Sequence, residues 1–158
     1  MLPDPGALYR DHATAVWRYA RARVPSDADA EDLTSDVFTR ILWAVEGYDA
    51  CRGTPRAWLM GIASKAVADF WRRRRLEEPH AEPPEAVDPV DMVDRSATAG
   101  EVRALLDVLS DREREVVSLR FGAELSSAEI GESMGISPTA RMLLHRAVTK
   151  LRGVMAHE

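Results

Sequence analysis

The last third of the chain carries basic side chains whose spacing suits binding to duplex DNA. From residue 141 to residue 152 the sequence has no acid, and its basic or potentially basic residues are Arg141, His145, Arg146, Lys150 and Arg152. Arginine and lysine bind phosphate oxygens and the acceptor edge of guanine, and both kinds of group are accessible along a DNA groove. The sequence therefore predicts a basic helix that contacts duplex DNA.

Two helix-start signals place a tight turn directly before this basic helix. Ser126 and Glu129 have the spacing of a capping box, which begins a short helix that ends at Gly135. Ser137 as N-cap and Pro138 at the first helical position then predict the start of the basic helix. A short helix, a tight turn and a basic helix in this order predict a helix-turn-helix, whose second helix enters the major groove.

A second basic stretch lies between residues 52 and 75. It contains seven lysines and arginines but only one acid, Asp69, and it ends in four consecutive arginines beside Trp71. Cations hold phosphates and an indole ring can stack on a base, so the stretch suits single-stranded nucleic acid. The sequence leaves open whether Trp71 contacts DNA or belongs to the core. Trp58 lies on the apolar side of its helix and is expected in the core.

Helical periodicity in the first half of the chain supplies the elements that would position this stretch. Apolar residues recur at helical spacing and predict helices over residues 9–24, 26–45 and 54–70. Ser26 and Asp29 form a capping pair for the second helix. Thr54 as N-cap and Pro55 at the first helical position begin the third. Because no stretch alternates with a period of two, we expect an all-α fold.

Residues 76–98 separate this helical part from the one that carries the helix-turn-helix. The segment contains seven acids, a single arginine and four prolines, with little large apolar content. Such a composition cannot bury enough apolar surface to offset the cost of ordering, so we expect a flexible acidic linker. The predicted organisation is two small helical domains, residues 1–75 and 99–158, joined by the linker 76–98. In the second domain, Ser110 and Glu113 form another capping box.

Composition argues against several functional classes. The chain has 158 residues, one cysteine (Cys51) and four scattered histidines, which leaves no disulfide and no metal-ligand spacing. There is no glycine-rich phosphate loop and no nucleophile beside a base, so we expect neither an enzyme nor a cofactor. No apolar run suggests membrane insertion, and we expect a cytoplasmic protein. The net charge of -5 conceals basic and acidic blocks of opposite sign.

Five segments, taken together, resemble the extracytoplasmic-function sigma factors of bacteria. They follow one another in the family order and are residues 29–38, 55–63, 109–117, 125–131 and 145–147. The resemblance implies a non-enzymatic factor that keeps only the second and fourth conserved sigma regions. Such a factor binds core RNA polymerase and directs it to promoters by recognising minus-ten and minus-thirty-five elements. An anti-sigma factor is the usual regulator in this family.

The resemblance also implies roles for individual residues. It places the contacts with core polymerase on the second helix, at Glu31, Asp32, Ser35, Asp36 and Phe38. It places the contacts with melted minus-ten DNA at Arg52, Lys65, Trp71, Arg72, Arg73 and Arg74. The contacts with the minus-thirty-five duplex would be made by Ser137, Thr139, Arg141, His145, Arg146 and Lys150.

Two other functions remain open from the sequence. A stand-alone helix-turn-helix regulator would bind duplex DNA without polymerase, and its N-terminal part would serve dimerisation or ligand binding. Residues 137–147 are one residue shorter than the usual pattern of the sigma family. A sigma-like interaction protein with impaired promoter readout would instead occupy polymerase or sequester a regulator.

Overall fold

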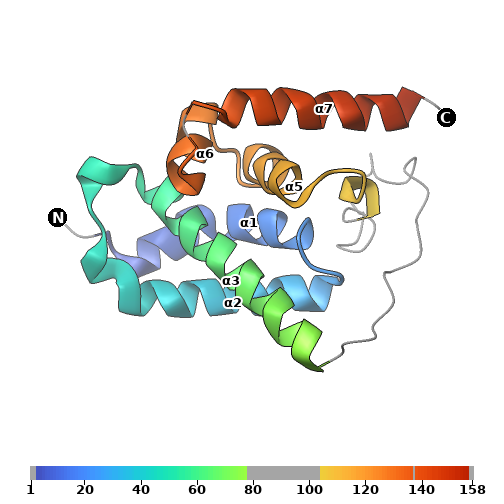
Figure 1. Ribbon diagram of the computed structural model, residues 1–158. Helices are drawn as coiled ribbons and strands as arrows, with labels where there is room; N and C mark the ends of the chain where they lie inside the picture. The colour runs from blue at the N-terminus through green and yellow to red at the C-terminus, as the bar shows by residue number, and fades with distance from the viewer. Residues whose placement is uncertain (1–2, 78–103, 137, 157–158) are drawn as a thin grey trace.

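The computed structural model describes residues 3–77, 104–136 and 138–156, and these residues form helices and turns with no strand among them (Figure 1). The all-α prediction is confirmed. The acidic linker predicted at 76–98 lies outside the described residues from residue 78 onwards. None of the helices in the described part of the chain has the length and apolar character that crossing a membrane requires.

Three helices form the N-terminal part. Helix α1 (Pro5–Arg21) begins at Asp4, whose carboxylate accepts a hydrogen bond from the backbone N–H of Ala7 at 3.0 Å. This start is four residues earlier than the apolar pattern predicts, because Asp4 as cap and Pro5 at the first helical position begin the helix before that pattern starts at Tyr9. Helix α2 (Asp27–Ala44) begins after Ser26, whose hydroxyl oxygen accepts from the N–H of Asp29 at 3.1 Å as predicted.

The third helix, α3 (Pro55–Glu77), is 23 residues long and carries most of the second basic stretch. Thr54 caps it as predicted, since its hydroxyl oxygen accepts from the N–H of Ala57 at 3.1 Å. Leu59, Ala63 and Ala66 are buried against the other helices. The helix therefore holds its arginine-rich end at a fixed distance from the loop that contains Arg52.

Four described segments form the C-terminal part. They are a helical turn at residues 104–106, α5 (Asp111–Val117) with the π-helical turn η4 (Ser118–Gly122), α6 (Ser127–Met134) and α7 (Ala140–Ala156). Both predicted capping boxes form, at Ser110–Glu113 and at Ser126–Glu129. Gly135 ends α6 in the left-handed conformation with φ of 70°, which glycine adopts without a steric penalty.

The predicted start of the last helix is wrong by two residues. Pro138 lies in the turn that precedes α7, whose first residue is Ala140. The carbonyl of Ile136 accepts hydrogen bonds from the N–H groups of Thr139 (2.8 Å) and Ala140 (3.2 Å), so this turn leads directly into the helix. Ser137, the predicted N-cap, lies outside the described residues.

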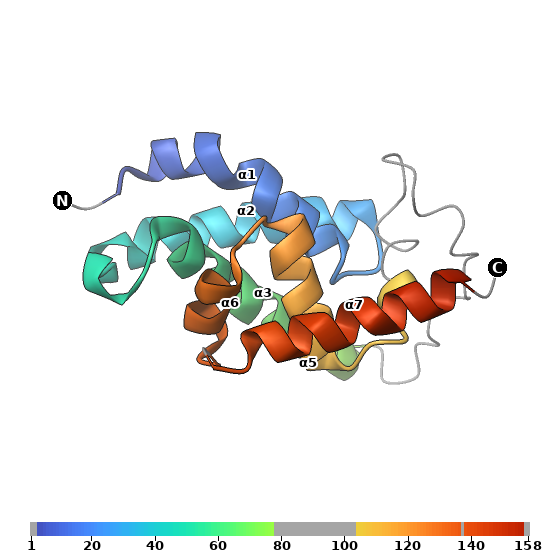
Figure 2. The same cartoon turned by 90° about the horizontal axis from the view of Figure 1, so that it is seen from above.

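The two helical parts pack directly on each other. Figure 1 shows α5 and α6 between α7 and the three N-terminal helices, and Figure 2 shows α7 lying across α5. A single cluster of buried side chains includes Val16 and Leu59 from the N-terminal part and Leu119 and Ile130 from the C-terminal part. A smaller cluster joins α5 to α7. The sequence predicts two separate helical domains, but it does not predict that they share a core.

Candidate nucleic-acid interface

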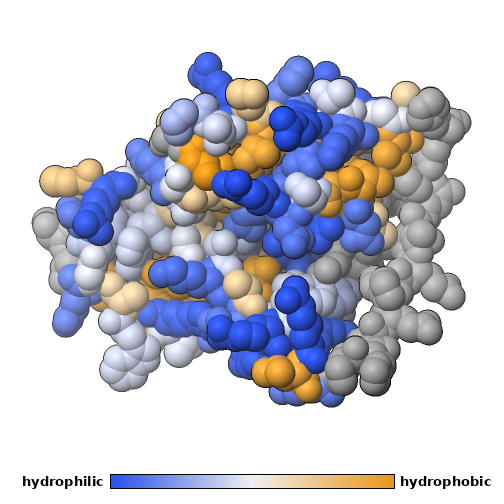
Figure 3. Space-filling model, viewed as in Figure 1, coloured by the Kyte–Doolittle hydropathy of each residue, from blue (hydrophilic) through white to orange (hydrophobic). Residues whose placement is uncertain are grey.

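The exposed face of α7 carries the side chains predicted to contact duplex DNA. A shallow hollow of about 540 Å³ runs along it, and the described residues that line this hollow, none of them acidic, are Arg141, Met142, His145, Arg146, Thr149 and Lys150. In the view of Figure 3, hydrophilic side chains lie beside apolar ones along the upper edge, where α7 runs. Thr139 is exposed just before the helix. The structure thus brings four of the six predicted residues to one surface.

Lys150 also has a structural role that the sequence does not predict. Its ammonium donates a hydrogen bond of 2.7 Å to a carboxylate oxygen of Glu113, whose side chain is only 3% exposed. This ion pair joins α7 to the start of α5. The Lys150 ammonium lowers the pKa of Glu113 to about 2; burial opposes this effect, and hydrogen bonds from Ser110 support it.

This ion pair predicts a pH dependence of folding. Because the folded pKa of Glu113 lies below the ordinary value of 4.5, the ionised carboxylate stabilises the fold above pH 4.5. That stabilisation decreases as the pH falls from 4.5 towards 2. We expect Glu113→Gln, which can still cap α5, to be less stable than the unmodified chain at pH 7 and to approach it in stability in acid. Urea unfolding of both proteins between pH 7 and pH 2.5 measures this difference, and a constant difference would contradict the assignment.

The residues predicted to contact minus-ten DNA lie in the turn η2 (Ala50–Arg52) and on α3, in two groups. Arg52 and Lys65 line a cavity of about 440 Å³ with Trp58 and Gly61, and residues of α6 form its opposite wall. Arg52 and Lys65 are exposed, whereas Trp58 is half-buried against the core as predicted. Lys65 and Arg72 are seven residues apart and therefore lie on the same face of α3, about two helical turns from each other. We call Arg52, Lys65 and Arg72 the minus-ten surface.

The second group lies at the C-terminal end of α3, where most side chains already have protein partners. Arg72 pairs with Asp69 at 2.6 Å, and Arg74 pairs with Asp29 at 3.6 Å. The indole N–H of Trp71 donates to the carbonyl of Arg23 at 2.9 Å, so this half-buried ring fixes α3 to the end of α1. Trp71 therefore packs against the core, and its contact with DNA stays a prediction. Arg73 is exposed.

The residues predicted to contact polymerase lie on α2. Glu31, Asp32 and Ser35 are exposed, while Asp36 accepts a hydrogen bond from Arg40 at 3.1 Å. Phe38 packs edge-on against Tyr9 of α1, with ring centroids 5.0 Å apart. A groove between α1 and α2 is lined by Glu31 and Ser35 on one side and by the aromatic rings of Tyr9 and Trp17 on the other.

Sequence reasoning missed two apolar residues at the end of α2. Leu42 is 60% exposed and Trp43 is 85% exposed, although both are large and apolar. Helical periodicity could have identified them as exposed, because neither residue belongs to the buried stripe formed by Leu33, Val37 and Ile41. Exposed large apolar residues, and a Trp side chain above all, are typical of a protein-binding surface.

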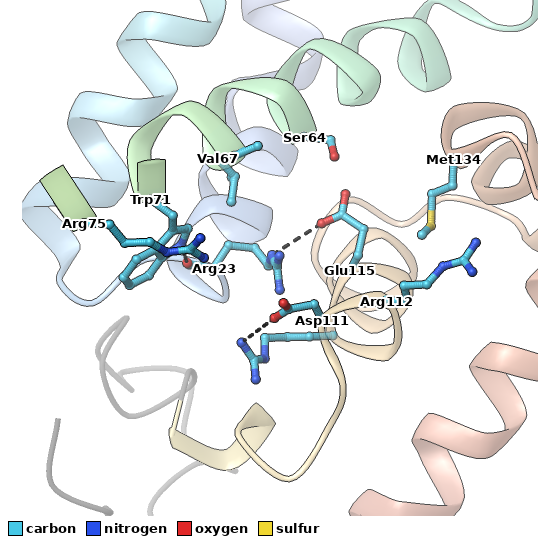
Figure 4. A pocket seen from close by; sticks show the side chains of 11 residues that line it. Arg23, Ser64, Val67, Trp71, Arg75, Asp111, Arg112, Glu115 and Met134 are labelled. Carbon is cyan, nitrogen blue, oxygen red and sulfur yellow. Dashed lines mark hydrogen bonds and ion pairs between the residues drawn. The ribbon is translucent and has the colours of Figure 1, made fainter. Parts of the chain in front are cut away.

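A buried polar cluster joins the two helical parts and was also missed. Glu115 of α5 forms an ion pair with Arg23 at 3.3 Å, and the hydroxyl of Tyr19 lies 2.7 and 2.8 Å from its two carboxylate oxygens. Burial and the adjacent Glu115 carboxylate raise the pKa of Tyr19, which keeps its hydroxyl a donor. Figure 4 shows the ion pair beside a cavity of about 420 Å³ that Arg75 and Arg112 also line. In the described part of the chain, no three His, Cys, Asp or Glu side chains are grouped to hold a metal ion.

Comparisons with known proteins identify the same two regions. The family model for sigma-70 region 2 matches residues 8–77, and the model for sigma-70 region 4 matches residues 105–153. The chain is 32% identical to the ECF RNA polymerase sigma factor SigE of Mycolicibacterium smegmatis, over 98% of this chain and 63% of that protein. It is also 32% identical to the RNA polymerase sigma-E factor of Streptomyces avermitilis, over 90% of this chain and 80% of that protein.

A solved structure shares the fold over nearly the whole chain. This is the sigma factor RpoE of Bartonella quintana, in a complex with the anti-sigma factor NepR. The TM-score is 0.76 at 18% sequence identity, and the match covers 96% of each chain. The chain spans less than two thirds of the length of the Mycolicibacterium smegmatis SigE protein. It spans four fifths of the length of the Streptomyces avermitilis sigma-E factor.

Proposed function

Because this chain belongs to the extracytoplasmic-function RNA polymerase sigma factors, we propose that it binds core RNA polymerase and directs it to promoters. The observation that carries this proposal is the helix-turn-helix, in which a capped α6 and the left-handed Gly135 present the basic hollow of α7. Polymerase performs the chemistry, and this chain acts in the cytoplasm without catalysis or a cofactor. An anti-sigma factor regulates it.

Binding to polymerase occurs through α2. Its exposed face begins with the acids Glu31 and Asp32 and ends with Leu42 and Trp43. An acidic segment is complementary to a basic partner, and a large exposed indole supplies apolar area that binding can bury. The groove between α1 and α2 extends this surface towards Tyr9.

Binding to the promoter uses two separate surfaces. The minus-ten surface combines Arg52, which precedes α3, with Lys65 and Arg72 of α3, and these cations attract the phosphates of a melted strand. The hollow of α7 carries Arg141, His145 and Arg146 on a helix that fits the major groove of the minus-thirty-five element. Neither surface alone defines a promoter, so recognition depends on both parts of the chain.

Run-off transcription with purified core polymerase tests this function. Mapping of transcription start sites after overexpression supplies the promoter templates. Arg146→Ala removes an exposed cation from the hollow, and we expect it to lower promoter-dependent transcript by about tenfold, as for one lost base contact. Its free energy of unfolding should be unchanged. Lys150→Ala should lower both transcript and stability, because it also removes the partner of Glu113.

Arg10→Ala provides the matched control, since Arg10 is an exposed cation on α1 that forms only a long ion pair of 3.9 Å with Asp4. Three results would contradict the proposal in different ways. Duplex binding without any dependence on polymerase would support a stand-alone regulator. Polymerase binding without transcription would support an interaction protein with impaired readout. Unchanged transcription by Arg146→Ala would refute the role of α7.

A further inference from the structure

Among the described residues that line the hollow of α7, Met142 is the only one whose side chain carries neither a charge nor a hydrogen-bond donor. Its side chain is 64% exposed, although methionine is large and apolar. Leu143 and Leu144, which follow it in sequence, pack instead against the buried clusters of the protein. Packing of the core therefore does not account for an apolar side chain at residue 142.

Met142 lies where a recognition helix contacts bases. It is the third residue of α7, and the N-terminal residues of a recognition helix are the ones that reach base edges in the major groove. His145, Arg146 and Thr149 follow it at helical spacing, so the four side chains share one face of the helix. This helix lies on the outer side of α5, away from the N-terminal helices (Figure 1). A duplex that bound the cations of this face would bring base edges against Met142.

Thymine is the base whose edge suits this side chain. In the major groove every base presents hydrogen-bond donors or acceptors, and thymine alone adds an apolar group, its C5-methyl. A thioether has no donor and is a weak acceptor, so opposite another base it would remove water from a polar group without replacing the hydrogen bond. Opposite thymine it would bury a methyl group, and the flexible methionine chain can adapt to the position of that methyl.

We propose that Met142 contacts the C5-methyl group of a thymine in the minus-thirty-five element and makes one position of that element selective for thymine. This inference rests on the proposed function in one respect, namely that α7 enters the major groove. It adds a base preference to a surface whose other side chains bind phosphates or polar base edges. Met142 is not among the residues that the sequence predicts to contact this element.

Replacement of thymine by deoxyuridine tests the inference, because it removes the C5-methyl group and leaves base pairing unchanged. The probes are synthetic duplexes of a promoter mapped by its transcription start site, with each thymine of the minus-thirty-five element replaced singly on either strand. The full chain is bound to core polymerase, and its apparent affinity for each duplex is measured at one fixed salt concentration. We expect deoxyuridine at one position to weaken binding about fourfold, which corresponds to burial of one carbon group at about 0.8 kcal/mol.

Variants assign this effect to the Met142 side chain. Met142→Ala should bind the thymine duplex about fourfold more weakly and should no longer distinguish thymine from deoxyuridine at that position. Met142→Leu keeps an apolar side chain and should keep the preference for thymine. Val108→Ala is the matched control, because Val108 is also an exposed apolar residue but lies outside α7. Since Met142 is exposed, the free energy of unfolding of Met142→Ala should be unchanged.

Several results would overturn the inference. Deoxyuridine without effect at every thymine of the element would do so, as would a minus-thirty-five element made of G·C pairs alone. A Met142→Ala protein that keeps the full preference for thymine would also refute it. If Met142→Ala weakened binding to core polymerase instead, the side chain would belong to a protein contact. Absence of promoter-dependent transcript from the unmodified duplex would refute the proposed function itself, whereas loss of the methyl contact alone would leave that function intact.

Discussion

Replacing Glu115 by alanine is expected to destabilise the folded chain by about 3–5 kcal/mol, which is the usual cost of removing one partner from a buried ion pair. The side chains of Arg23 and Glu115 are 12% and 9% exposed, so the substitution leaves a largely buried guanidinium without its carboxylate. Tyr19 would lose its acceptor as well, although its hydroxyl is completely buried. Urea unfolding followed by circular dichroism measures the loss.

The control for this substitution lies in the same interface. Glu124 pairs with Arg18 at 3.6 Å between the same two parts of the chain, but these side chains are 65% and 52% exposed. Glu124→Ala should therefore cost less than about 1 kcal/mol. Equal losses for the two variants would show that Glu115 is not the residue that holds the interface together.

A second comparison separates the charge of Glu115 from its shape. If Arg23→Met is combined with Glu115→Leu, no buried charge remains without a partner. Well-packed apolar replacements of buried ion pairs are often neutral or stabilising, so the double variant should recover most of the stability lost by Glu115→Ala. A double variant as unstable as the single one would mean that the cluster contributes through its hydrogen-bond geometry.

Local signals in the sequence predict most of the helices, because the N-cap residue and the three residues that follow it are enough to mark where a helix begins. Ser26, Thr54, Ser110 and Ser126 all cap the helices that they were predicted to cap. The failure at Pro138 has the same origin, since Ser137 and Pro138 fit a helix start but the turn after Gly135 extends through Thr139. A local pattern cannot show where a neighbouring turn ends.

Long-range contacts account for what the sequence could not predict. Glutamate and lysine usually lie in solvent on the surface of a helix. Glu115 and Lys150 instead each form an ion pair with a residue that is distant in the sequence. Ninety-two residues separate Arg23 from Glu115 in sequence, and no periodicity within either helix identifies that pairing. The exposed side chains of α7 are different, because a basic face that remains in solvent can be predicted from helical spacing alone.

Replacing Gly122 by leucine is expected to separate the two helical parts. A Cβ at Gly122 would lie 3.0 Å from the backbone nitrogen of Tyr19 and 3.2 Å from the carbonyl carbon of Arg18. These are backbone atoms inside α1, so they cannot rotate away as a flexible side chain would. Overpacking of this kind costs about 1–3 kcal/mol even where the surroundings relax. Either the packing of η4 on α1 is strained by that amount or the η4 turn moves away from α1.

The cost of this substitution can be compared with that at a glycine that has free space around it. Gly122→Leu should lower the free energy of unfolding measured with urea, because a leucine side chain cannot be accommodated where η4 packs on the backbone of α1. Gly153→Ala provides the control: a Cβ there meets no atom within 4 Å, so α7 should gain about 0.5–1 kcal/mol of stability. A Gly122→Leu protein that is as stable as the unmodified chain would show that η4 does not pack on α1.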